Sequence, residues 1–203
     1  MRTGTTIMIR SACLLTFLLV LEQAAFAAGE IREFDLRTIE RLGAQLTNPP
    51  PSDSGVPARA KQTAVAALNG KLFNIRYSYA VLRDPDGSGF LVYALGEGPR
   101  RGDVVIHGHF RATVNADGTK AERVEPLSKS LLIDNQKSER LPKGYKQIEY
   151  VTVQIVGTRP LETLIYASNM LRQPIAVTTM DGQTWFIEKG RITKDLSTRS
   201  PKS

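Results

Sequence analysis

The chain has 203 residues, of which 23% are charged and 41% are hydrophobic, and it carries a formal net charge of +7. This balance excludes an acidic disordered tail and a long coiled coil. A single cysteine excludes a disulfide-stapled scaffold and a cysteine-rich zinc module. The length predicts one folded domain.

The first 27 residues have the three parts of a secretory signal peptide. Arg2 and Arg10 precede an apolar run over residues 12–21, and Ala25 and Ala27 form a small-residue cleavage site. The apolar run is shorter than the about 20 residues that cross a bilayer. We therefore expect cleavage after Ala27, a periplasmic or extracellular location, and no transmembrane segment in the mature chain. An uncleaved N-terminal anchor is the alternative.

Removal of the signal peptide changes the composition of the chain that remains. Cys13 is lost, and the net charge falls from +7 to +6 because Arg2, Arg10 and Glu22 are lost as well. An exported chain without disulfides depends on its own hydrophobic core. A domain of this size buries about 70% of the surface of its unfolded chain, which is enough to form one.

Two helices are predicted near the start of the mature chain. The first spans residues 35–46 with Asp35 as its N-cap, and the second spans residues 57–68 with Pro57 in its first turn. Between them, residues 47–57 contain three consecutive prolines, which neither continue a helix nor donate hydrogen bonds to a sheet. We expect a stiff, exposed connector here.

The central and C-terminal sequence predicts strands and one late helix. Short turns between consecutive strands indicate antiparallel pairing. We expect an α+β fold, with a mostly antiparallel sheet of about six or seven strands and with two N-terminal helices and one late helix packed on one face. The predicted strands are 73–81, 90–95, 104–114, 120–125, 148–156, 175–179 and 184–188, and the late helix runs from about residue 158 to 172.

The domain organisation follows from these elements. We expect a single α+β domain over residues 28–190, which includes a long polar excursion over residues 127–146. Residues 191–203 are rich in Ser, Lys and Arg and predict a flexible basic tail.

The only two histidines are candidate metal ligands. His107 and His109 lie two positions apart on a predicted strand, so their side chains share a face. Two imidazoles at this spacing suit zinc, copper or nickel, with a third ligand from an Asp or Glu of a neighbouring strand. The alternatives are two polar residues on the solvated side of the strand, or a histidine that acts as an acid or base.

The segment from Asp84 to Gly89 resembles the start of a calcium-binding loop. Asp84, Asp86 and Ser88 place oxygen atoms at alternate positions, as such a loop requires. However, Leu95 stands where the loop needs a bidentate glutamate. An ordinary hairpin turn uses the same residue types and is the alternative.

The sequence holds no catalytic signature. It lacks a nucleophile elbow, a P-loop and a dinucleotide-binding fingerprint. We therefore expect no cofactor and predict a non-enzymatic binding or interaction module of the cell envelope. The alternative is a metal-dependent envelope hydrolase that uses His107 and His109.

Positive charge suggests the kind of partner. A basic exported protein attracts anionic material, so we expect an envelope protein or an anionic cell-surface component, and no nucleic acid. Alternatively, the net charge only maintains solubility. The predicted basic patch consists of Lys129, Lys137, Arg140, Lys143 and Lys146.

Several segments are similar to a set of small uncharacterised exported (periplasmic) proteins of Proteobacteria. The most recognisable segments are residues 34–43, 109–114, 116–118, 126–130 and 174–185, and the similarity extends in pieces over about half of the mature chain. The proline-rich connector departs from the pattern. The resemblance implies a location in a Gram-negative envelope, and it implies no activity, cofactor or functional residue.

Overall fold

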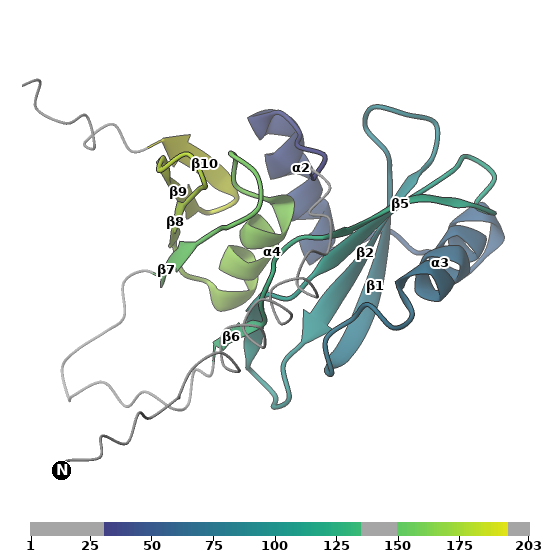
Figure 1. Ribbon diagram of the computed structural model, residues 1–203, viewed down its shortest axis with the longest axis horizontal. Helices are drawn as coiled ribbons and strands as arrows, with labels where there is room; N and C mark the ends of the chain where they lie inside the picture. Colours follow the sequence, from purple (N-terminus) through teal and green to yellow (C-terminus); the bar gives the residue numbers. More distant parts are fainter. Residues whose placement is uncertain (1–30, 135–149, 195–203) are drawn as a thin grey trace, which may run out of the picture.

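The computed structural model describes residues 31–134 and 150–194 (Figure 1). The described helices are α2 (Leu36–Thr47), α3 (Gly55–Leu68) and α4 (Glu162–Leu171). The described strands are β1 (Arg76–Arg83), β2 (Phe90–Glu97), β3 (Val104–His107), β4 (Phe110–Val114), β5 (Ala121–Pro126), β6 (Leu132–Asp134), β7 (Tyr150–Val153), β8 (Ile175–Thr178), β9 (Thr184–Glu188) and β10 (Arg191–Lys194). The predicted α+β class is confirmed.

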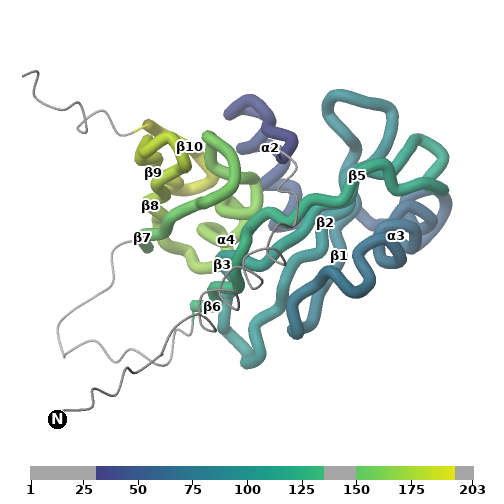
Figure 2. The backbone as a smooth tube through the Cα atoms, viewed as in Figure 1, coloured from purple at the N-terminus to yellow at the C-terminus, as the bar shows by residue number. Residues whose placement is uncertain are grey.

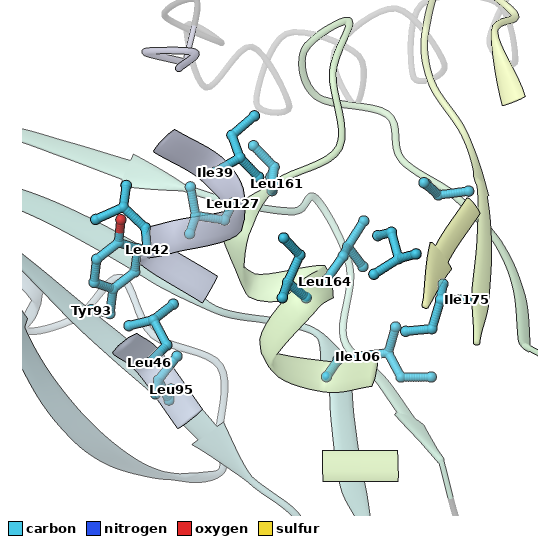
Figure 3. Packing of buried hydrophobic residues seen from close by; sticks show 14 of the residues in the cluster. Ile39, Leu42, Leu46, Tyr93, Leu95, Ile106, Leu127, Leu161, Leu164 and Ile175 are labelled. Atoms are coloured by element: carbon cyan, nitrogen blue, oxygen red, sulfur yellow. The ribbon is translucent and has the colours of Figure 1, made fainter. Parts of the chain in front are cut away.

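Helix α2 begins where its sequence predicts. The side chain of Asp35 accepts hydrogen bonds from the backbone N–H groups of Arg37 and Thr38, which have no partner inside the helix. Ile39, Leu42 and Leu46 are fully or almost fully buried. Their spacing places all three on one face, which packs into the main hydrophobic core (Figure 3).

The proline-rich connector between α2 and α3 is shorter than the sequence predicts. Thr47 still belongs to α2, and α3 begins at Gly55, two residues before Pro57. Proline fits there because the first N–H groups of a helix need no intrahelical partner. The buried face of α3 consists of small residues and one leucine: Ala60, Ala64 and Leu68.

Four antiparallel strands form sheet A in the order β1-β2-β4-β5. β2 is a central strand, and seven of its eight residues are buried. Both faces of this strand are therefore covered, as its continuous apolar run predicts. Apolar side chains on both faces require cover on both sides. α3 therefore packs on one face, whereas α2 and α4 lie on the side of Tyr93 and Leu95 (Figures 1 and 3). The helices thus cover two faces of this sheet and not one.

Sheet C forms a further layer, with the order β10-β9-β8-β7. β7, α4 and β8 form a crossover unit, so β7 pairs with β8 in parallel, while β8, β9 and β10 pair antiparallel. One face of this sheet, which includes Ile175, Val177 and Ile187, belongs to the main core with α2 and α4. Arg191 to Lys194 form β10, so the predicted tail begins no earlier than residue 195, outside the described residues.

The single long strand predicted over residues 104–114 is broken in two. Gly108 has a φ of +122°, and a Cβ atom there would lie 2.6 Å from Leu131 Cδ1. Only glycine fits this conformation and this close approach. The break sends β3 to a small sheet with β6, and the two lie together in Figure 2, while β4 continues in sheet A.

Candidate functional site

The two histidines are buried rather than solvated. His109 Nδ1 accepts a hydrogen bond from the N–H of Gly96 at 3.0 Å, and Nε2 donates to the carbonyl of Val105 at 3.1 Å. Burial lowers the pKa of His109 to about 4, so the ring is neutral at pH 7. Because both ring nitrogens have backbone partners, His109 has no free lone pair for a metal in this arrangement.

His107 has a different environment on β3. Its Nε2 lies 2.7 Å from Oγ1 of Thr152, so the ring connects β3 to β7, and burial lowers its pKa. Within the described ranges, no group of three His, Cys, Asp or Glu side chains is placed to hold a metal ion. The metal site at His107 and His109 stays a prediction, with no third ligand among these residues.

The calcium-like turn faces a cation of the chain itself. Arg32 donates to both carboxylate oxygens of Asp84, at 2.7 and 2.6 Å, and to Asp86 at 2.9 Å. Burial alone would raise the pKa of Asp84, but the hydrogen bonds and charge of Arg32 outweigh it and lower that pKa. Ser88 lies exposed in the same turn. A guanidinium thus occupies the position where the sequence suggests a metal.

An ionic cluster lies inside the molecule and has no counterpart in the sequence analysis. The guanidinium of Arg111, on β4, donates to Glu125 at 2.9 Å, to Glu162 at 2.6 Å and to the backbone carbonyl of Arg32 at 2.5 Å. The hydroxyl of Tyr93 donates to the same oxygen of Glu162 at 2.8 Å. Glu125 also accepts the N–H of Arg32 at 2.6 Å. The cluster therefore joins sheet A, α4 and the segment that precedes α2.

This cluster is closed to solvent. Arg111, Tyr93 and Glu162 are fully buried, and Glu125 is almost so. Burial opposes the charge of Arg111, but Glu162 and Glu125 hold the pKa of Arg111 further above its usual value. Burial and the neighbouring Glu162 raise the pKa of Tyr93 well above its usual value. No substrate reaches these groups in this conformation, so we assign them a structural role.

A shallow depression lies between the tips of two hairpins. It has a volume of about 460 Å³, and its lining includes Asp84, Ser88, Thr113 and Asp117. Asp84 is paired with Arg32, and Asp117 accepts hydrogen bonds from Thr119. Small-molecule sites are lined mainly by apolar and aromatic side chains, whereas this lining is mostly polar and has only Val114 and Ala116 as apolar side chains.

Strand β7 presents the most unusual surface of the described chain. Its side chains alternate: Thr152 is buried, whereas Val151 and Val153 are 70% and 60% exposed, and Ile155 beyond the strand is 45% exposed. β7 is the outer strand of sheet C, and no other described strand pairs with its free side. Three of the seven exposed large apolar residues of the described chain lie in this five-residue stretch.

The free edge of β7 differs from the other outer strands of the four-stranded sheets. Proteins protect sheet edges with charged side chains, proline or bulges, because unpaired backbone groups recruit other strands. β7 has neither a charged residue nor a proline. The other three outer strands carry charged residues, and β5 also contains a proline. These residues are Arg76 and Arg83 in β1, Glu122, Arg123, Glu125 and Pro126 in β5, and Arg191 and Lys194 in β10.

The predicted basic patch is only partly described. Lys129 is exposed in the bend after β5. Lys137, Arg140, Lys143 and Lys146 lie outside the described residues, and so does the predicted signal peptide. The free edge of β7 is a feature that the sequence analysis missed, because alternation shows a half-buried strand without showing which strands are outermost.

Comparison with known proteins found no relative. No protein-family model, no curated protein and no solved structure matches this chain. Of the helices described, none combines the length and the apolar character needed to cross a bilayer. Inference about function therefore depends on the geometry of the chain itself.

Proposed function

We propose that this protein is a non-enzymatic interaction module of the cell envelope, which binds an extended segment of a partner along the free edge of β7. The observation that carries the proposal is the uncharged outer strand with Val151 and Val153 exposed. Addition of a strand to such an edge is a general mode of recognition, in which backbone hydrogen bonds supply affinity and alternate side chains supply specificity.

The backbone geometry of β7 supports strand addition. The N–H groups of Tyr150 and Gln154 donate to carbonyls of Pro174 and Thr178, on the β8 side. Since backbone groups alternate in direction along a strand, the N–H and C=O groups of Val151 and Val153 point to the free side. The contact between His107 and Thr152, on the buried face of β7, also holds the strand in place.

The envelope location follows from the predicted signal peptide and the resemblance to exported proteins. Partners would be an envelope protein or an anionic cell-surface component, since the chain carries a net positive charge. The metal-dependent hydrolase receives no support from the described geometry of His109. N-terminal sequencing of the protein from the periplasmic fraction is expected to begin at Ala28, and an untrimmed chain in the cytosol would contradict the location.

The binding proposal can be tested in cells with a photo-crosslinking amino acid. Placed at Val153, it should yield a discrete covalent adduct, because this side chain borders the free edge. Val65 on α3 is the matched control, since it is also an exposed valine, at 40%. Equal adducts at both positions, or none at Val153, would refute binding at β7.

A further inference from the structure

We infer that the occupant of the β7 edge is a second copy of this chain, whose own β7 pairs antiparallel with it about a twofold axis at Thr152. This inference rests on the proposed function, because it names the partner of the same edge. It predicts a symmetric dimer in which two four-stranded sheets join into one continuous sheet.

The pattern of outward backbone groups matches such a twofold pairing. In an antiparallel ladder, two residues that face one another exchange both hydrogen bonds when their backbone groups point toward the partner strand. A twofold axis at Thr152 places Val151 opposite Val153 of the second copy, and the reverse. Both residues have outward backbone groups, so the pairing forms four hydrogen bonds without any residue out of register.

The side chains are complementary under the same operation. Residues directly opposite one another in a sheet have Cβ atoms about 4.5–5.5 Å apart, so each exposed valine would contact a valine of the other copy. β7 has no charged residue, so the pairing places no like charges opposite one another. A strand of this composition is its own complement, which is the condition for an isologous interface.

The size of the contact sets the expected strength. β7 has four residues, so strand pairing alone buries far less than the about 1,200 Å² of a stable interface. We therefore expect a weak, concentration-dependent dimer. Its two valine pairs supply most of the apolar contact, and their replacement should abolish it.

Charge reversal tests the pairing and its register together. In the variant Val151→Glu/Val153→Glu, every cross-strand pair would set two carboxylates opposite one another. In Val151→Lys/Val153→Glu, the same axis would set each lysine opposite a glutamate. Val65→Glu on α3 is the control for a new surface charge, and circular dichroism checks that each variant is folded.

Sedimentation of the purified mature protein, at concentrations up to about 1 mM, should show a dimer for the unaltered protein and for Val65→Glu. The double-glutamate variant should remain monomeric, with dimerisation weakened at least about tenfold, and the lysine–glutamate variant should dimerise again. A monomeric unaltered protein, or no recovery in the lysine–glutamate variant, would overturn the twofold pairing.

The crosslinking experiment separates the two proposals. An adduct of twice the chain mass at Val153 supports the second copy. If the purified protein is monomeric and the Val153 adduct has another mass, the second copy is wrong while strand addition at β7 stands. If no adduct forms, both proposals fail.

Discussion

Replacement of Arg111 with methionine removes a fully buried guanidinium. It leaves the buried carboxylate of Glu162 without its ion-pair partner, while the buried carboxylate of Glu125 keeps, among the described residues, only Arg123, which is 41% exposed. The long side chain of methionine fills similar space, so the change isolates charge and hydrogen bonding from packing. Three hydrogen bonds are lost, at 2.9, 2.6 and 2.5 Å.

The expected cost follows from these contacts. Hydrogen bonds to charged groups contribute about 1.5–3 kcal/mol each, but the cost of burying the guanidinium disappears with it. Removal of one partner of a buried ion pair typically costs about 3–5 kcal/mol. For a chain of this size we expect the Tm to fall by about 6–20 °C.

A double-mutant cycle in urea identifies the cause. Glu162→Gln keeps an acceptor for the hydroxyl of Tyr93 and removes the charge. The double variant Arg111→Met/Glu162→Gln no longer carries the uncompensated carboxylate of Glu162. Its free energy of unfolding should therefore fall by about 1–3 kcal/mol less than the sum of the falls in the two single variants. Arg191→Met is the control, because Arg191 is 79% exposed in its pair with Glu40 and should contribute at most about 1 kcal/mol.

Two results would contradict a stabilising ion pair between Arg111 and Glu162. One is a fall in the free energy of unfolding of less than about 1 kcal/mol for Arg111→Met, which would mean that water or rearrangement compensates the buried carboxylates. The other is an additive cycle, which would show that Arg111 and Glu162 stabilise the fold independently.

Three further changes test other parts of the structure. The pKa of His109 is about 4 in the folded protein and about 6.5 when unfolded, so the unfolded state binds more protons between these values. The free energy of unfolding should therefore fall as the pH drops from 6.5 to 4, and a His109→Gln variant should show a shallower fall in urea titrations. Gly108→Ala should cost about 1–3 kcal/mol because of its positive φ and crowded surroundings, more than Gly70→Ala, whose Cβ would meet nothing within 4 Å. Addition of calcium should leave the Tm unchanged because the carboxylate of Asp84 is already paired with the guanidinium of Arg32. A rise in Tm would indicate a calcium site instead.

Elements with local signals could be predicted from the sequence alone. Asp35 caps α2 through N–H groups two and three positions away, and the prolines between α2 and α3 stop both helices wherever the rest of the chain goes. The apolar run of β2 showed that both faces of this strand are buried. Each of these signals depends on backbone geometry within a few residues, so no knowledge of the tertiary contacts is needed to interpret it.

Contacts between residues far apart in the chain could not be predicted and are set by the tertiary fold. Arg111 and Glu162 are 51 positions apart, and Arg32 and Asp84 are 52 apart, so no spacing rule connects them. The same holds for the edge of β7, because its neighbour β8 follows only after α4 and its free side depends on the order of strands. Burial and strand pairing depend on what the remainder of the chain places beside a residue, whereas caps and turns depend on the residues that adjoin it in sequence.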